Sequence, residues 1–161
     1  MSEIEILPIS NQSYHVLSIM VGELLSEIMD ATNERAFNYD QHETERRAKE
    51  LIESEKYWVF MAKDKSSGEY IGFVSIYESY ALYSEGAYGT IPELYVSPEW
   101  RSNAVGSKLL KSVMEFAVKK DWRRLEVTTP PLPEFTRTLK FYESNNFKIS
   151  GGRKLVVSVN A

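Results

Sequence analysis

The order in which β-rich and amphipathic helical segments follow one another constrains the fold of this chain most strongly. Strands are expected at 3–7, 57–63, 70–77, 87–96, 125–129, 147–150 and 154–159, and helices at 16–29, 43–56, 105–120 and 134–144. Strands joined by short turns favour antiparallel hairpins, whereas strands joined through a helix favour crossover connections. The order therefore predicts an α/β fold in which helices cover a mixed sheet.

The expected strand 87–96 contains a proline, Pro92. Proline has no N–H group to donate within a sheet, so it is found at sheet edges and bulges. We therefore expect the sheet to open at Pro92. Three further prolines, Pro130, Pro131 and Pro133, are expected to end the next strand.

Length and composition indicate one domain, residues 1–161. A chain of 161 residues can bury about 70% of the surface that it exposes when unfolded, and 43% of these residues are hydrophobic. There is no cysteine, which excludes disulfides, thiolate metal ligands and a cysteine nucleophile, and the only histidines are His15 and His42. We therefore expect neither a metal site nor a Ser-His-Asp triad.

The N-terminal residues are acidic, where a secretory signal would be basic, and no apolar run approaches the length of a membrane span. We therefore expect a cytoplasmic protein without a membrane partner. The formal net charge of −4 argues against nucleic acid as a partner.

Charge is distributed unevenly between two neighbouring stretches. Residues 99–124 carry seven basic and three acidic residues, a local charge of +4. Between Lys65 and Arg101 there is no basic residue, while five glutamates contribute −5. These glutamates are Glu69, Glu78, Glu85, Glu93 and Glu99. The two stretches are expected to face different ligands, although an ordinary solvated surface would also explain them.

The most informative segment is 93–110, where a short strand, a turn and the loop 101–106 (RSNAVG) lead into a helix. Several backbone N–H groups at a helix N-terminus lack partners within the helix, and the helix dipole adds about half a positive charge there. The loop is therefore expected to bind an anion.

This loop resembles the Arg/Gln-x-x-Gly-x-Gly/Ala loop of the GCN5-related N-acetyltransferase family, which holds the pyrophosphate of coenzyme A. The segment 136–147 (TRTLKFYESNNF) is similar to the family helix that carries Phe-Tyr ahead of a Gly-Phe turn. The joint order and spacing of the two motifs are more specific than either motif alone. The resemblance covers most of the chain from Tyr57 onward. It implies a three-layer α/β/α fold with a mixed central sheet opened at the fourth strand, and acetyl-CoA as co-substrate.

By this resemblance, the residues that bind acetyl-CoA lie on the fourth strand, in the loop and at the start of the following helix. They are Leu94, Tyr95, Val96, Arg101, Ser102, Asn103, Ala104, Val105, Gly106 and Ser107. Tyr142 matches the family tyrosine that protonates the leaving thiolate, and Glu93 lies where many members place a carboxylate near the acceptor amine. Without these motifs Tyr142 would be interpreted as a core residue, and Glu93 is equally open to a structural role.

Simple pKa values support these two roles. A lysine-like amine has a pKa of about 10.4, so only about one molecule in a few thousand is neutral at pH 7 and a proton must be removed. A carboxylate is a weak base toward such an amine, so Glu93 is expected to act through a water molecule or by steering the cation. A tyrosine of pKa about 10 can protonate a thiolate of pKa about 8.5 at a cost of about 2 kcal/mol. Tyr142 therefore needs little tuning to act as a general acid.

Four positions depart from the family pattern. Ala104 stands where the family has its first glycine and adds a methyl group where the main chain approaches phosphate. Phe135 replaces an asparagine that contacts the cofactor arm, and Thr138 replaces an alanine. Asn146 replaces the turn glycine but can adopt the same left-handed conformation. Ala104 and Phe135 keep open a second hypothesis, a catalytically weak acyl-CoA-binding or regulatory module.

The sequence thus predicts an N-acetyltransferase that moves an acetyl group from acetyl-CoA to a primary amine of a small molecule or a protein. Because there is no cysteine to carry an acyl intermediate, the amine is expected to attack the thioester directly in a ternary complex. The acidic stretch and its tyrosines predict a cationic acceptor. These tyrosines are Tyr70, Tyr77, Tyr80, Tyr83 and Tyr88. A homodimer is compatible with the sequence.

Overall fold

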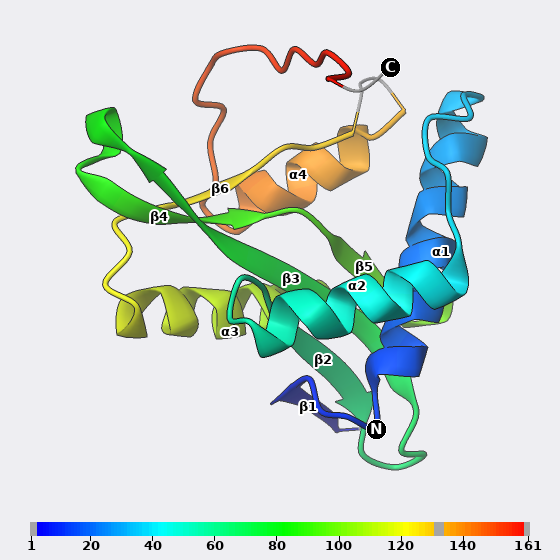
Figure 1. Cartoon of the computed structure of the whole chain (residues 1–161). Coiled ribbons are helices and arrows are strands. Elements are labelled where there is room, and N and C mark those ends of the chain that lie inside the picture. Colours follow the sequence, from blue (N-terminus) through cyan, green and yellow to red (C-terminus); the bar gives the residue numbers. More distant parts are fainter. Residues whose placement is uncertain (1–2, 131–133, 160–161) are drawn as a thin grey trace.

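The computed structural model describes residues 3–130 and 134–159 and contains a six-stranded mixed sheet with helices on both faces (Figure 1). The strands are β1 (Ile4–Pro8), β2 (Trp58–Asp64), β3 (Tyr70–Ala81), β4 (Gly86–Ile91), β5 (Leu94–Val96) and β6 (Leu125–Val127). The helices are α1 (Tyr14–Thr32), α2 (Gln41–Glu53), α3 (Val105–Lys119) and α4 (Thr136–Ser144), with 3-10 turns η1 (Leu82–Ser84) and η2 (Pro98–Trp100). Pro131 and Pro133 lie outside the described residues.

The sheet has the order β1-β2-β3-β4-β6, and β3 carries two partners on one edge. The second half of β3 pairs antiparallel with β4, and its first half pairs antiparallel with β5. Strand β4 runs parallel to β6 as far as Ile91. Beyond Ile91 the chain no longer pairs with β6 but still bonds to β3, where the Ser75 N–H donates to the Glu93 carbonyl at 3.0 Å. The expected strand 87–96 is thus interrupted at Pro92 and Glu93, and the expected mixed sheet with an opening at this point is confirmed.

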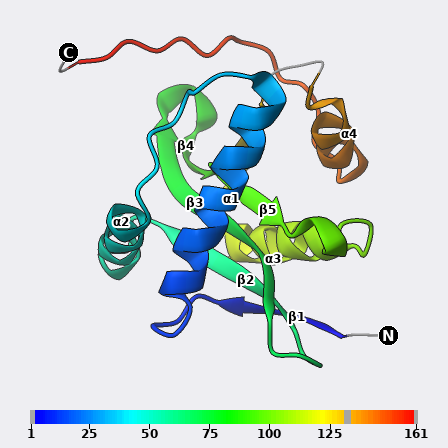
Figure 2. The ribbon, with the colours of Figure 1, turned by 90° about the vertical axis from the view of Figure 1, so that its right-hand side faces the viewer.

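Two apolar clusters lie on opposite faces of the sheet. Leu17 and Met20 of α1 pack with Phe73 and Tyr95 on one face. On the other face α3 packs with Val74 and its neighbours, and Tyr142 of α4 joins this cluster. Phe73 and Val74, which are consecutive in β3, belong to different clusters because successive side chains of a strand point to opposite faces. Figure 2 shows α1 and α2 toward one side of the sheet and α3 and α4 toward the other.

Local chemistry explains the ends of the first two helices. The Asp40 carboxylate accepts the N–H of Glu43 at 2.9 Å and caps the N-terminus of α2. Asn33 follows α1 in the left-handed conformation, with φ 56°, and its N–H donates to the Met29 carbonyl. No helix in the described part of the chain is long and apolar enough to cross a membrane.

The expected C-terminal hairpin of 147–150 and 154–159 is wrong. These residues pair with no strand among those described, and the chain runs away from the body of the fold after Phe147 (Figures 1 and 2). The sequence has strand-like alternation, but a strand is stable only where it meets a sheet edge or packing surface. Gly151 and Gly152, with φ of 100° and 82°, redirect the chain there instead of closing a hairpin.

Candidate functional site

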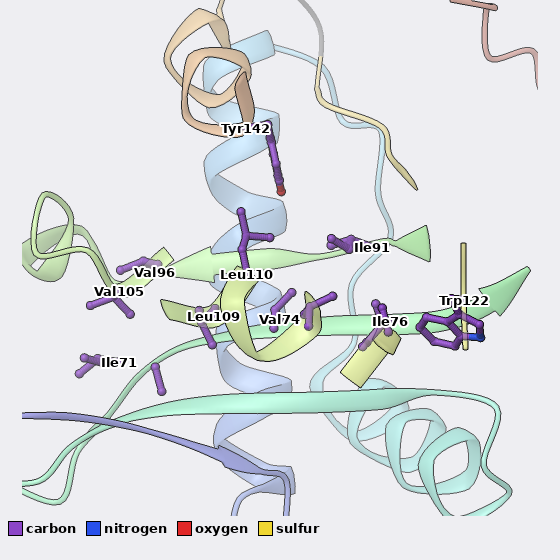
Figure 3. Packing of buried hydrophobic residues seen from close by; sticks show 13 residues of the cluster. Ile71, Val74, Ile76, Ile91, Val96, Val105, Leu109, Leu110, Trp122 and Tyr142 are labelled. Carbon is purple, nitrogen blue, oxygen red and sulfur yellow. The ribbon is translucent and has the colours of Figure 1, made fainter. Parts of the chain in front are cut away.

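The two predicted catalytic residues lie on opposite faces of the sheet, at its opening. Glu93 stands between β4 and β5, and Ser75 of β3 holds its carboxylate. Because Val74 and Ile76 face α3, Ser75 between them faces α1, and so does the Glu93 carboxylate. Tyr142 belongs to the α3-facing cluster, and Figure 3 shows its hydroxyl oxygen directed toward that cluster near Leu110.

Two hydroxyl groups hold the Glu93 carboxylate through one of its oxygens. The Tyr57 hydroxyl donates to Oε1 at 2.8 Å, and the Ser75 hydroxyl donates to the same oxygen. Burial, followed by the charge of Glu93, raises the pKa of Tyr57, so this hydroxyl stays a donor at any working pH. In the described part of the chain Oε2 accepts no hydrogen bond, so it is the oxygen that an ammonium group or a water would meet.

An open acidic hollow lies on the same face as the Glu93 carboxylate. It has a volume of about 630 Å³ and is lined by Glu23, Ser26, Glu27, Asp30, Ala31, Tyr95 and Pro98. Tyr95 follows Glu93 by two residues and packs in the α1-facing cluster, which connects the hollow to the opening. Burial and then the charge of Glu23 raise the pKa of Tyr95 to about 12. The α1 side of the opening is therefore negative.

Tyr142 is positioned by the close approach of α4 to the start of α3. A side chain on Gly106 would place its Cβ 2.8 Å from the end of the Phe141 ring, so any other residue there would force this ring to shift. Tyr142 is only 6% exposed, and its ring packs against Phe141 and Phe147 with centroid separations of 5.1 and 5.4 Å. Burial raises the pKa of Tyr142, so the hydroxyl carries its proton throughout the neutral range.

The loop before α3 combines left-handed backbone with side chains that bond its main chain. Ser102 and Ala104 both have positive φ, 75° and 62°, and the Asn103 amide donates to the carbonyls of Trp100 and Arg101 at 3.3 Å each. Ala104 is the N-cap residue of α3, and no side chain caps the helix. The first N–H groups of α3 therefore remain available to an anion. An L-residue in the left-handed conformation costs about 1–2 kcal/mol, which Ala104 bears where the family has glycine.

Arg101 connects this loop to α1. Its Nε donates to the Val96 carbonyl at 2.8 Å, and its two terminal nitrogens donate to the Glu27 carboxylate at 2.6 and 2.8 Å. The guanidinium also lies 5.6 Å from the centre of the Tyr95 ring. Each terminal nitrogen keeps a second N–H beside the one given to Glu27, and a contact between Arg101 and phosphate stays a prediction.

Three residues of the site were not predicted from the sequence: Tyr57, Ser75 and Glu27. They lie 36, 18 and 74 residues from their partners Glu93 and Arg101. No local motif marks them, because their roles depend on strand pairing and on the packing of α1.

The tyrosines expected to face the acceptor have different surroundings. Tyr83 and Tyr88 both lie beside the chain's own Arg124, which is 5.2 and 4.9 Å from their ring centres. The Tyr80 hydroxyl donates to Glu78. Tyr77 alone reaches the Glu93 cluster, since its ring stacks on Tyr57 at 6.1 Å. Among residues 3–130 and 134–159, no group of three His, Asp or Glu side chains could hold a metal ion.

Comparison with known families gives one match, in which residues 23–147 fit the family model described as "Acetyltransferase (GNAT) family". A curated relative, an "Uncharacterized N-acetyltransferase" of Archaeoglobus fulgidus, is 30% identical over 78 residues, or 48% of this chain and 52% of that protein. The match thus spans about half the length of this relative.

Solved structures share the fold over nearly the whole chain. An aminoglycoside N-acetyltransferase in complex with CoA superimposes with a TM-score of 0.81 at 15% identity, covering 99% of this chain and 97% of that one. A ribosomal-protein-alanine N-acetyltransferase from Brucella melitensis biovar Abortus 2308 superimposes with a TM-score of 0.74 at 17% identity, covering 97% and 100%. At these identities the similarity establishes the fold, and the acceptors of these proteins differ in kind.

Proposed function

We propose that this chain, which belongs to the acetyltransferase (GNAT) family, transfers an acetyl group from acetyl-CoA to a primary amine by direct attack. The observation that carries the proposal is the opening of the sheet, which has a protonated tyrosine on one face and a held carboxylate on the other. Two reactants can enter from opposite faces and meet there without a covalent intermediate.

The α3 side fits acetyl-CoA as a substrate. The uncapped N-terminus of α3 offers the N–H groups of residues 102–107 to the pyrophosphate, and the exposed Lys108 and Lys111 add positive charge nearby. Strand β5 pairs only with β3 among the described strands, so its other edge faces the opening. The main-chain groups of β5 that do not pair with β3, apart from the Val96 carbonyl that Arg101 holds, can then pair with the amide groups of the substrate's arm.

In the proposed reaction the amine nitrogen forms a bond to the thioester carbon, and the carbon–sulfur bond breaks with its electron pair on sulfur. The Tyr142 hydroxyl gives its proton to this sulfur and recovers one from solvent. The amine loses its proton to water or to the free Oε2 of Glu93. Tyr57 and Ser75 are positioning residues, because they hold Oε1 and leave Oε2 directed to the acceptor.

The acceptor is proposed to be cationic and to approach from the α1 side. The hollow brings Glu23 and Asp30 to the face that carries the Glu93 carboxylate, and Glu27, which also lines it, is paired with Arg101. A polyamine, an aminoglycoside-like compound or a protein amine has the charge that this face attracts. Attraction between exposed charges is screened by salt, so the Michaelis constant for the acceptor should rise with ionic strength.

Purified protein incubated with acetyl-CoA and a panel of amines tests the proposal through the release of free thiol. The panel should contain polyamines, aminoglycosides, lysine peptides and, as matched controls, neutral and acidic amines. Faster release with the cationic amines is expected. Equal rates with neutral or acidic amines would contradict a cationic acceptor, and no release with any amine would contradict transfer.

A second function, an acyl-CoA-binding or regulatory module, is favoured by Ala104 in its left-handed conformation and by Phe135. Calorimetry with CoA separates the two functions. Binding without thiol release for any amine supports the module, whereas absence of binding at millimolar CoA contradicts both.

A further inference from the structure

The side chain of Tyr95 is almost fully buried, yet its hydroxyl group has no partner. Tyr95 is 4% exposed, and its hydroxyl makes no hydrogen bond within residues 3–130 and 134–159. In these residues, no side-chain oxygen or nitrogen that is closed to solvent lacks a partner. The hydroxyl oxygen therefore opens onto the acidic hollow, which Tyr95 lines. Such a hydroxyl, surrounded by apolar packing and open only to a hollow, is a group that a ligand would satisfy.

Three acidic side chains of α1 line the same hollow. Glu23, Glu27 and Asp30 recur at spacings of four and three residues, which brings them to one face of the helix. Glu27 pairs with Arg101 at 2.6 Å, whereas the carboxylates of Glu23 and Asp30 have neither an ion pair nor a hydrogen bond in the described part of the chain. Three carboxylates against one guanidinium leave a net charge of −2.

These charges oppose the stability of α1. Carboxylates one turn apart repel each other, and Asp30 lies in the last turn of α1, where the helix dipole is itself negative. That turn contains no basic residue to compensate the charge. Together with the Tyr95 hydroxyl, the unpaired carboxylates indicate a cation that comes from outside the chain.

The hollow lies close to the proposed point of transfer. Glu93 and Tyr95 lie opposite Ser75 and Phe73 of β3, and their side chains share the face toward α1, which lies beside β5 (Figure 2). Two residues of a strand span about 7 Å. A cation in the hollow would therefore lie about 7 Å or more from an amine that meets Glu93.

We propose that the acidic hollow holds a second ammonium group of the acceptor, so that the acceptor is a small molecule with at least two amines separated by several bonds. The second ammonium donates to the Tyr95 hydroxyl, and Glu23 and Asp30 supply the charge that attracts it. The amine at Glu93 gives up its proton and attacks, while the one in the hollow keeps its charge. A volume of about 630 Å³ suits a small molecule. The inference rests on the proposed function and narrows its acceptor to the chemistry that aliphatic polyamines and aminoglycosides share.

A diamine and a monoamine of equal chain length test this inference. Thiol release from acetyl-CoA gives kcat/KM for cadaverine, for pentylamine, which lacks the second amine, and for ethylenediamine, whose amines are too close together to reach both sites. Cadaverine is expected to exceed both by about 10-fold or more. Equal values for cadaverine and pentylamine, or a lysine peptide preferred over every diamine, would overturn the proposal.

Substitutions in the hollow locate the second ammonium. Tyr95→Phe, Glu23→Gln and Asp30→Asn should each reduce the advantage of cadaverine several-fold and leave the rate with pentylamine unchanged. Glu69→Gln, in the turn between β2 and β3, removes one charge away from the hollow and should preserve the advantage. An advantage that survives all three substitutions in the hollow would overturn the proposal. Spermidine and an aminoglycoside are further arms, and the one whose kcat/KM depends more strongly on Glu23 and Asp30 identifies the source of the second ammonium.

Calorimetry separates the failure of this subsite from the failure of transfer. Cadaverine is titrated into the protein saturated with CoA, where no acetyl group can move. Binding that weakens in Glu23→Gln but not in Glu69→Gln supports the subsite even if no thiol is ever released with acetyl-CoA. Thiol release from monoamines and diamines alike would support transfer and overturn the subsite. Absence of cadaverine binding at millimolar concentration, or binding unchanged in Glu23→Gln, would also overturn the subsite.

Discussion

The two sides of the sheet opening are built in different ways. On the α1 side, Tyr57 and Ser75 hold the Glu93 carboxylate, and the three side chains come from distant parts of the sequence. On the α3 side, the proposed anion site is the backbone of one continuous loop, in which Ala104 offers no side-chain cap. A site made of side chains can be dismantled one group at a time, whereas a site made of main chain responds only to changes that alter the backbone. Substitutions on the two sides should therefore differ in kind as well as in size.

Tyr142→Phe should give the largest change, because it removes only the hydroxyl that we propose as the proton donor to the leaving thiolate. Loss of a general acid lowers a rate by about 10²- to 10⁴-fold. Burial raises the pKa of Tyr142, so the hydroxyl is protonated at neutral and mildly alkaline pH alike. The turnover number should therefore fall by the same factor across that range, with the affinity for CoA unchanged.

Turnover and calorimetry with CoA check this prediction, and Phe141→Leu on the same helix is the matched control for disturbed packing. An unchanged turnover number in Tyr142→Phe would contradict the proposed catalytic role and leave Tyr142 with a structural role in the core.

Glu93→Gln should act on the acceptor rather than on CoA. It keeps an acceptor oxygen for Tyr57 and Ser75 but removes the charge that meets the ammonium group. A hydrogen bond to a charged group contributes about 1.5–3 kcal/mol, so the acceptor's Michaelis constant should rise by about 10- to 100-fold. Its dependence on salt should weaken.

Tyr57→Phe tests the positioning role separately, because it leaves the Glu93 charge in place and leaves Oε1 held by Ser75 alone. It should raise the same Michaelis constant by less than Glu93→Gln, while the salt dependence stays that of the original chain. If the acceptor's Michaelis constant in Glu93→Gln depends on salt as strongly as in the original chain, the proposed role of the Glu93 charge is contradicted.

The contrast between the two sides also separates what the sequence could predict from what it could not. The loop before α3, expected at 101–106, was predictable because its residues are adjacent, although α3 already begins at Val105. The opening at Pro92 was predictable too, since it follows from the missing N–H of one residue. The contacts of Glu93 and Arg101 were not predictable, since they depend on which strands and helices become neighbours. The expected C-terminal hairpin failed for a related reason: alternation shows that 154–159 can form a strand, but not which edge it joins.

Arg101→Ala and Glu27→Gln examine the one contact that joins the two sides. Arg101 ties the loop to α1 through Glu27 and to β5 through Val96. Both side chains of this pair are 39% exposed, so the pair itself adds at most about 1 kcal/mol to stability. Arg101→Ala should weaken CoA binding without abolishing it, because the main chain does most of the holding.

Glu27→Gln then shows whether Arg101 also contacts phosphate. If it does, release from Glu27 should tighten CoA binding measured by calorimetry. If Arg101 only fixes the loop, binding should weaken as it does in Arg101→Ala. Unchanged binding in both variants would contradict any role of Arg101 in the anion site.

Ala104→Gly should give the smallest change, and it is the one substitution that acts through the backbone of the α3 side. Ala104 has φ 62°, where its Cβ costs about 1–2 kcal/mol that glycine does not bear. Glycine also gives the unfolded chain more freedom, which costs about 0.4–1 kcal/mol, so the net gain in stability should be at most about 1.6 kcal/mol. CoA affinity should rise a few-fold, because the methyl group no longer stands where the main chain approaches phosphate.

Ser102→Gly is the matched control, since Ser102 has φ 75° in the same loop but lies before the first family glycine position. Tighter binding in Ala104→Gly alone would assign the effect to the methyl group, whereas equal tightening in both variants would assign it to relief of loop strain. Unchanged CoA binding in Ala104→Gly would remove the main support for a weakened, non-catalytic module.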